Sequence, residues 1–188
     1  MHRRHLNELL QRYVRAWPGE AAVAARFAAF AAGHADCLLR TCVPGHVTAS
    51  AWIVDATGAR ALLTLHRKLG RWLQLGGHVD GEACIERSAL REAQEESGMQ
   101  RFTFVPWSGA SLVPLDLDVH PIPARKSEPE HLHWDLRFLL QAEPGQELVT
   151  SDESNDLRWF SAEELHQVTD EDSVLRLWRK AELVRGRG

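Results

Sequence analysis

Apolar residues recur at helical spacing near the start of the chain and at strand-like spacing further along. In the segment 5–16 they follow the i, i+3, i+4, i+7, i+8 pattern of a helix with one buried face. These residues are Leu6, Leu9, Leu10, Tyr13 and Val14. The alanine-rich segment 20–35 predicts a second helix, because alanine is the strongest helix former. The breaker sequence Trp17-Pro18-Gly19 separates the two segments, so a helical hairpin is expected.

From residue 46 the pattern changes to short β-rich runs bounded by turn residues. The runs "HVTASAWIVD" and "RALLTLHRK", separated by "ATGA", predict a β-hairpin. Further strands are predicted within 102–120 (two strands), 131–143 and 156–160. A turn is predicted at Gly76-Gly77, and the Pro-rich segment 121–130 is predicted to be a loop.

Three more helices are predicted among these strands. The first covers 84–97 and ends at a glycine, which is favoured just after a helix. Ser161 and Glu164 form a capping-box signature at the start of the second. Thr169 and Asp172 repeat that signature before the last helix. The alternation of strands and helices predicts a fold of the α/β class.

Composition and charge are those of a globular protein. Of 188 residues, 44% are hydrophobic and 26% charged, a length that suits one domain over 41–188 after a helical extension over 1–40. The net charge of -4 argues against a polyanion-binding surface, so no stable nucleic-acid complex is expected. No segment is apolar enough to predict a membrane span, and no membrane association is expected.

Cysteine usage and the N-terminus predict a cytoplasmic protein. The three cysteines include no C-x-x-C pair, which indicates neither a disulfide framework nor a zinc ribbon. The basic N-terminal segment lacks the apolar core and cleavage site of a secretory signal.

The predicted helix over 84–97 carries an unusual cluster of carboxylates. Glu92, Glu95 and Glu96 are spaced i, i+3, i+4, so they lie on one face within a single turn. Three such charges repel, and a divalent cation with a preference for hard oxygen ligands, Mg²⁺ or Mn²⁺, relieves that repulsion. Arg91 precedes Glu95 by four residues and can orient its carboxylate. The alternative interpretation is a solvated acidic face.

The residues around the cluster extend it to a longer pattern, G-x5-E-x7-R-E-U-x-E-E-x-G-U, in which U is apolar. The residues that match it are Gly77, Arg91, Glu92, Ala93, Glu95, Glu96, Gly98 and Met99. This pattern resembles the Nudix box, and the chain is similar to Nudix hydrolases (MutT-like proteins). One position departs: Ala83 stands where the box has its first glutamate, and Glu82 precedes it. In the family that glutamate mainly supports the loop, so the departure concerns loop rigidity more than chemistry.

The resemblance extends over roughly residues 40–165. Segments such as "GGHVDG" and "HLHWDLR" are similar to a bacterial Nudix subgroup of this length without a settled common substrate. The resemblance implies the Nudix fold, a mixed β-sheet in an α/β/α sandwich, here with an N-terminal helical hairpin. It also implies a divalent-metal-dependent hydrolase that cleaves a pyrophosphate bond in a nucleoside diphosphate linked to another moiety X.

The resemblance also implies roles for individual residues. Mg²⁺ (or Mn²⁺) would be held by Glu92, Glu95, Glu96 and the carbonyl of Gly76. The catalytic residues are expected to be Glu95 and Glu92, with Arg91. Which carboxylate acts as the base varies across the family, and acids of later loops stay open as alternatives. These are Glu143, Asp152 and Glu153.

Basic and imidazole side chains near the box are candidates for substrate binding. Arg67, Lys68 and Arg71 lie in the segment that leads to it and either reach a phosphate or are solvated loop charges. His78 and His133 are further candidates. His131, His133, Asp135 and Arg137 share one face of a predicted strand, which suggests a second metal site or a phosphate-binding shell. Singly, each histidine is more often a hydrogen-bonded structural residue.

Two other functions are alternatives. An isopentenyl-diphosphate isomerase-like enzyme shares the fold and uses His and Glu ligands, but Cys84 lies in the box rather than where that chemistry needs a cysteine. A non-catalytic ligand-sensing Nudix domain is the second alternative, although sensors usually lose the metal carboxylates. The expected partner is a small nucleotide or diphosphate, and a homodimer is expected because many Nudix enzymes dimerise.

Overall fold

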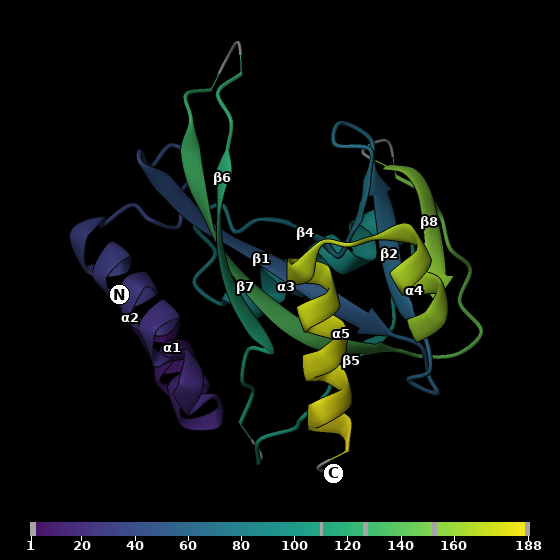
Figure 1. Cartoon of the computed structure of the whole chain (residues 1–188). Helices are drawn as coiled ribbons and strands as arrows, with labels where there is room; N and C mark the ends of the chain where they lie inside the picture. Colours follow the sequence, from purple (N-terminus) through teal and green to yellow (C-terminus); the bar gives the residue numbers. More distant parts are fainter. Residues whose placement is uncertain (1–2, 110, 126–127, 152–153, 187–188) are drawn as a thin grey trace.

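The computed structural model describes residues 3–109, 111–125, 128–151 and 154–186 (Figure 1). Its helices are α1 (Arg3–Ala16), the short 3-10 helix η1 (Pro18–Glu20), α2 (Ala21–Gly33), α3 (Ile85–Ser97), α4 (Ala162–Val168) and α5 (Asp172–Arg185). Its strands are β1 (Gly45–Val54), β2 (Ala61–His66), β3 (Arg71–Leu73), β4 (Leu75–His78), β5 (Phe102–Phe104), β6 (Asp116–Ile122), β7 (His131–Ala142) and β8 (Ser154–Phe160).

A parallel pair of strands forms the centre of a mixed sheet. β1 and β7 pair from Gly45 opposite Leu132 to Val54 opposite Gln141. The other strands pair antiparallel: β2 and β4 with β1, β5 and β6 with β7, and β3 and β8 with β2. Each central strand therefore changes its outer partner along its length. Figure 1 shows the β6–β7 hairpin and the β2–β8 pair diverging as a result.

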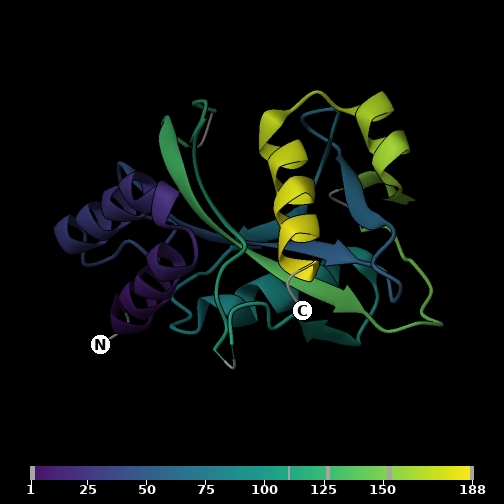
Figure 2. The same cartoon turned by 60° about the horizontal axis from the view of Figure 1, so that its bottom comes forward.

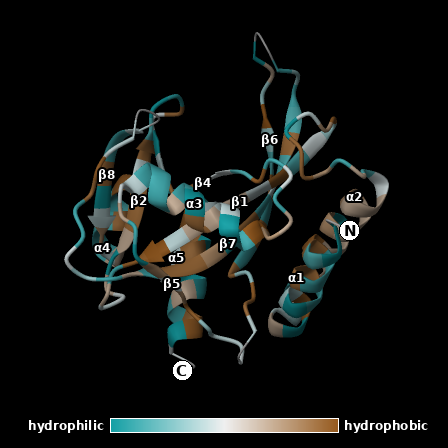
Figure 3. Ribbon diagram, turned by 180° about the vertical axis from the view of Figure 1, so that it is seen from behind, coloured by the Kyte–Doolittle hydropathy of each residue, from teal (hydrophilic) through white to brown (hydrophobic). Residues whose placement is uncertain are grey.

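Helices cover both faces of this sheet. α1, α2 and α3 pack against Ala49 and Leu136 in one apolar cluster, and α4 and α5 pack against Trp52 and Leu139 in another. Figure 2 shows α5 above the central strands and α3 below them. In Figure 3, which views the molecule from the opposite side to Figure 1, α3 lies in front of the sheet. β1 is buried along its whole length because it is covered on both faces. The predicted α/β/α sandwich with an N-terminal helical hairpin is confirmed.

A buried charged network joins the N-terminal hairpin to the opposite layer. The Lys180 side chain on α5 is 4% exposed and donates to Tyr13 Oη at 2.8 Å, to Glu20 at 3.0 Å and to Asp116 at 3.0 Å. Asp116 is fully buried and also accepts from Arg176 at 2.9 Å. Burying charges is costly unless they are paired, and here Glu20 and Asp116 supply the opposite charge to Lys180. The network therefore fixes α1 and α5 to the same strand.

Most predicted elements are present within one to three residues of their expected bounds. The β1–β2 hairpin forms, and α3 ends at Gly98 in the left-handed region with φ of 72°. The capping box at Ser161 and Glu164 is complete, with both reciprocal hydrogen bonds. Long periodic segments and side-chain caps are local properties, so they could be predicted without knowledge of the tertiary contacts.

Two local predictions were wrong. Gly76 and Gly77 do not form a turn but lie in strand β4, paired with Ser50 and Ala49 of β1. A Cβ at Gly76 would lie 2.4 Å from Ser50 Oγ, so only glycine allows this close pairing. The turn itself comes later, at residues 80 and 81, which have positive φ.

The second error concerns the start of α5. Thr169 and Asp172 do not form a capping box, because the helix is preceded by Glu171. The Thr169 hydroxyl accepts from the Glu171 N–H at 3.1 Å, and Asp172 pairs with Arg179 at 2.8 Å. Among the described helices, none is both long enough and apolar enough to cross a membrane.

Replacing Lys180 by alanine tests the buried network. Because Glu20 and the fully buried Asp116 lose a cationic partner, we expect the free energy of unfolding to fall by about 3 kcal/mol. Urea unfolding of Lys180→Ala measures this loss. The exposed Lys68→Ala variant is the control and should stay within about 0.5 kcal/mol of the parent. Equal midpoints for the two variants would contradict a stabilising role of the network.

Candidate active site

The glutamates of α3 lie beside the glycine pair of β4. The Glu92 side chain is 15% exposed, and a Cβ built on Gly77 would lie 2.6 Å from its carboxylate carbon. The absent side chain at Gly77 therefore leaves the space that the Glu92 carboxylate fills. Glu95 and Glu96 follow on the same turn of α3, and the Glu95 side chain is 59% exposed. One carboxylate is thus held against the sheet and a second faces solvent.

Arg91 connects these carboxylates to the sheet. Its Nη1 donates to Glu95 Oε2 at 2.8 Å, while Nη2 lies 2.8 Å from Glu92 Oε1 and 2.8 Å from the His78 carbonyl oxygen. The expected contact with Glu95 is present, and the pairing with Glu92 is an addition that helical spacing does not predict. A single guanidinium therefore offsets the repulsion between two neighbouring carboxylates and fixes α3 to β4.

The donor set suits a hard divalent cation. Carboxylate oxygens are the ligands that Mg²⁺ and Mn²⁺ prefer, and the glycine pair lets a carboxylate approach the backbone. Two groups of three described residues place one ligand atom each within 4.8 Å of one another, and the glutamates of α3 belong to neither. In this conformation Arg91 holds two of the carboxylates, so gathering them around an ion requires the exposed Glu95 to rotate away from Arg91.

Other contacts brace the loop in which Ala83 replaces a glutamate. Glu82 Oε1 accepts from the Cys84 N–H at 2.9 Å, just before α3 begins. Arg40 donates to Asp80 at 2.7 Å, across the turn that follows β4. At the other side of α3, Glu86 pairs with His5 of α1 at 2.7 Å. Glu82 thus supports the loop through its backbone, whereas the box arginine takes Glu92 and Glu95 as partners.

Histidines gather on the sheet face opposite α3. His46 and His133 are paired in the parallel register, and their ring centroids are 4.9 Å apart. The rings of His78 and His131 lie 4.9 Å and 5.0 Å from that of His46. Burial, together with neighbouring histidines, lowers the pKa of His46 to about 4 and of His133 to about 2. Burial and the charge of Arg40 also lower the pKa of His78. The structure therefore brings His78 and His133 together as neutral groups.

Asp135 and Arg137 share that face, as strand alternation predicted, but they are structural. The Arg137 guanidinium donates to Asp135 at 2.9 Å, to Asp118 at 3.0 Å and to Asp116 at 3.3 Å. Asp135 accepts in addition from the hydroxyls of Thr48 and Ser50. Because Arg137 is buried and surrounded by carboxylates, it does not form part of a phosphate-binding shell.

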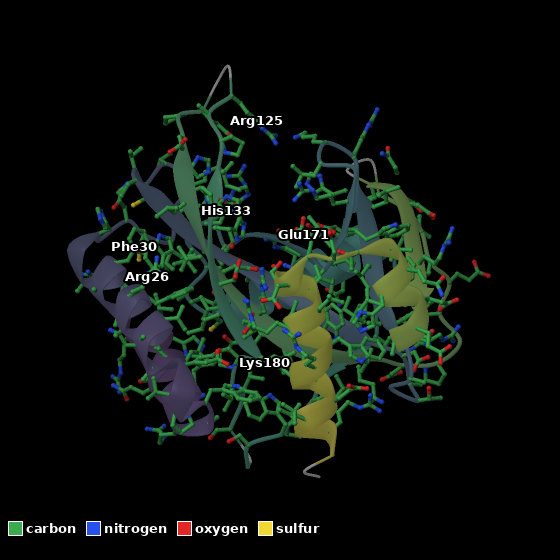
Figure 4. All side chains as sticks on the ribbon, in the orientation of Figure 1. Arg26, Phe30, Arg125, His133, Glu171 and Lys180 are labelled. Atoms are coloured by element: carbon green, nitrogen blue, oxygen red, sulfur yellow. The ribbon has the colours of Figure 1, made fainter. Side chains whose placement is uncertain are left out.

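The three basic candidates lie in the β2–β3 turn or at its end. Arg67 and Lys68 are exposed there, and the turn is closed by the His66 ring, which accepts from the Lys68 N–H at 3.2 Å. Arg71 begins β3 and pairs with Glu171 at the start of α5. Figure 4 places Glu171 near the N-terminal end of α5, with His133 beside β6 and β7.

Three carboxylates of later loops are the alternatives to the α3 glutamates as the base. Glu143 is exposed and pairs with Arg101 at 2.9 Å. Asp152 and Glu153 lie outside the described residues. Trp134 is buried and stacks on Phe30 at 4.4 Å, so it belongs to the core.

Comparison with known proteins places this fold in one family. The family model of the NUDIX domain matches residues 44–178. A NUDIX-family hydrolase from Clostridium perfringens is 27% identical, with 74% of this chain and 97% of that chain covered and a TM-score of 0.58. A C. elegans Ap4A hydrolase (18% identity, 74% and 97% covered, TM-score 0.59) and an E. coli dihydroneopterin triphosphate pyrophosphohydrolase (15%, 74% and 95%, 0.54) share the fold.

The chain belongs to the Nudix family. No curated protein matches it. The prediction of a Nudix pyrophosphohydrolase is confirmed at the level of the family, and the substrate stays open.

Replacing Gly77 by alanine tests whether the space beside this glycine positions the Glu92 carboxylate for metal binding. The three atoms nearest to the added Cβ all belong to the end of the flexible Glu92 side chain, so we expect the fold to survive while the carboxylate is displaced. Mn²⁺ binding, measured from the electron paramagnetic resonance of the unbound ion, should weaken about tenfold or more. Gly33→Ala is the matched control, because a Cβ there meets nothing within 4 Å. Unchanged Mn²⁺ affinity in Gly77→Ala would contradict this role.

The carboxylate of Asp118 gives a prediction for acid stability. Burial raises its pKa, but the hydrogen bond with His120 and the charges of Arg137 and Arg176 outweigh burial and hold the pKa well below its usual range. The unfolded chain therefore binds more protons below about pH 4, and stability falls as pH drops through that region. Urea midpoints at pH 5 and pH 3 should differ less in Asp118→Asn than in the parent.

The exposed Asp170→Asn variant is the control for this measurement and should keep the pH dependence of the parent. A pH dependence in Asp118→Asn as steep as that of the parent would contradict the assignment.

Proposed function

We propose that the protein is a divalent-metal-dependent hydrolase that cleaves the pyrophosphate bond of a nucleoside diphosphate linked to another moiety X. The observation that carries the proposal is the seating of Glu92 against Gly77, with Glu95 and Glu96 on the same turn and Arg91 bound to two of them. This arrangement concentrates negative charge beside the glycine pair of β4, whose backbone carries no side chains. A divalent cation bound there would neutralise this negative charge and would also contact the pyrophosphate of a substrate.

The residues of the site would have three roles: binding the metal ion, positioning the carboxylates and accepting a proton. Glu92, Glu95, Glu96 and the Gly76 carbonyl would hold Mg²⁺ or Mn²⁺, which when bound neutralises phosphate charge and acidifies a water. Arg91 positions the two carboxylates through its paired contacts and keeps α3 against β4. An oxygen of Glu95 or Glu92 accepts the proton of the attacking water, and the choice between them stays open.

Basic and imidazole side chains near the box would bind the substrate. Arg67, Lys68 and Arg71 come from the β2–β3 turn and supply positive charge for the phosphates. His78 and His133 are neutral at pH 7, since burial lowers the pKa of each, so they would contribute hydrogen bonds rather than charge. A homodimer and a cytoplasmic location remain expectations from the sequence.

Two rival functions share this fold. A ligand sensor would not need the carboxylates of α3, whereas all three glutamates are present here. An isopentenyl-diphosphate isomerase-like enzyme would use histidine ligands, and the cluster around His46 keeps that alternative open. Both differ from the hydrolase in their products, because neither releases phosphate or a nucleoside monophosphate from a nucleoside diphosphate derivative.

The replacement Glu95→Gln separates these functions. The parent and the variant would be assayed with Mg²⁺ and with Mn²⁺ against ADP-ribose, NADH, dinucleoside polyphosphates such as Ap4A, nucleotide sugars, dNTPs, coenzyme A and dihydroneopterin triphosphate. We expect turnover of at least one compound by the parent and a loss of about 10²-fold or more in kcat for the variant.

The exposed Glu163→Gln variant on α4 is the matched control and should keep full turnover. Turnover that survives unchanged in Glu95→Gln would contradict the proposed role of the α3 carboxylates. If the parent turns over none of the compounds while one of them still raises its melting temperature, the result would favour the sensor.

A further inference from the structure

Histidines from four strands meet on the face of the sheet that α3 does not occupy. His46 lies on β1, His78 at the end of β4, His120 on β6, and His131 and His133 on β7. His133 is opposite His46 in the parallel register and opposite His120 in the antiparallel one. Because alternate residues of a strand point to one face, this register places all these rings on the same side. The clustering thus comes from the topology of the sheet.

His46 is the buried centre of this group. Its side chain is 3% exposed, and neither ring nitrogen has a hydrogen-bond partner among the described residues. A neutral imidazole has one N–H donor and one lone pair, and leaving both unpaired in the interior is costly. The rings of His78, His131 and His133 surround it with centroids 4.9–5.0 Å away. A cation bound between these rings would accept the unused lone pair of His46.

Three of the rings present ligand atoms at a suitable separation. One nitrogen each from His46, His131 and His133 lies within 4.8 Å of the other two. A tetrahedral ion with bonds near 2.1 Å needs nitrogens about 3.4 Å apart, so side-chain rotations of modest size complete the site. Since His131 and His133 are only half-buried, a fourth position faces away from the core.

Contacts behind the rings support this geometry. His131 Nδ1 lies 2.9 Å from the Pro129 carbonyl oxygen, which can only accept, so Nδ1 carries the proton and Nε2 carries a lone pair. His120, beside His133 at 5.5 Å between centroids, pairs with Asp118 at 2.9 Å. A carbonyl or carboxylate behind an imidazole is the arrangement that orients histidine ligands in metal sites.

We propose that His46, His131 and His133 bind a divalent transition-metal ion of the Zn²⁺ or Co²⁺ kind, at a site separate from the α3 carboxylates. Imidazole nitrogens select such ions, whereas the glutamates of α3 offer the oxygen donors that Mg²⁺ and Mn²⁺ prefer. The two donor sets lie on opposite faces of the sheet, since His78 shares the face of Thr48 while Gly77 shares the face of Ala49 and touches Glu92. The proposal does not depend on the hydrolase function, and it assigns the lone pair of His133 to the ion, which leaves only the other ring nitrogen of His133 for a hydrogen bond to a substrate.

Cobalt spectroscopy of the whole chain tests the site without any activity assay. Protein freed of metal by a chelator would be titrated with Co²⁺, whose tetrahedral nitrogen complexes absorb strongly in the visible while octahedral oxygen complexes are pale. We expect a strong band that saturates at one ion per chain and disappears on addition of Zn²⁺. In His131→Asn and His46→Asn the band should be lost and Co²⁺ affinity should fall about tenfold or more.

Matched variants locate the ion. Glu96→Gln removes a donor of the α3 site, His34→Asn changes a second group of nearby donors formed with Asp36 and Cys42, and His166→Gln changes an exposed histidine of α4. All three should keep the band. His131 is half-buried, so its replacement should leave the fold intact, and unfolding curves of the metal-free variants verify this.

The proposal is overturned if the parent shows no tetrahedral band or if the band persists in folded His131→Asn. It is equally overturned if the band is lost in Glu96→Gln or in His34→Asn instead, because the ion would then lie at another site.

Discussion

The parallel pairing of β1 with β7 is the constraint on which the rest of the structure depends. It aligns Gly45 with Leu132 and keeps that register to Val54 and Gln141. Because the side-chain period is two, this register sends Ala49 and Leu136 to the α3 face and sends His46, His133 and Asp135 to the α5 face. A slip by one residue would exchange the two sets and expose the apolar core. The register therefore assigns one chemistry to each face of the sheet.

The polar face is stable only because its charges are paired. Arg137, buried on β7, lies among Asp116, Asp118 and Asp135, and Arg176 and Lys180 of α5 complete the pairing from the opposite layer. Removing any one of these groups leaves a partner in the interior without its counter-charge. The network connects β6, β7, α5 and the N-terminal hairpin, and it borders the histidines through the contact of Asp118 with His120. The same face thus has a rigid charged half and a half made of imidazoles.

Local signals in the sequence predicted much of the fold. The period of α1, the glycine after α3 and the capping box at Ser161 each depend on residues a few positions apart. The box pattern placed Arg91 and the glutamates on one helical turn, and the structure agrees.

What could not be predicted depends on pairing between distant segments. The position of Gly76 and Gly77 in a strand requires β1 as a partner, and the structural role of Arg137 requires carboxylates from β6. The encounter of His46 with His131 and His133 likewise arises only once β1 and β7 are parallel. Alternation predicted that His131 and His133 share a face, but it describes residues of a single strand and so could not predict that His46 of β1 lies beside them.

The two donor sets differ in how the protein prepares them, and this difference argues for separate roles. Glu95 is largely exposed and already paired with Arg91, so an ion bound by the proposed oxygen site would replace one positive partner of this carboxylate by another and would exchange readily. His46 is buried with two unpaired nitrogens, so binding an ion there removes a cost that the metal-free fold carries. An exchangeable oxygen site suits an ion that arrives and leaves with a pyrophosphate. A buried nitrogen site suits a resident ion that stabilises the sheet.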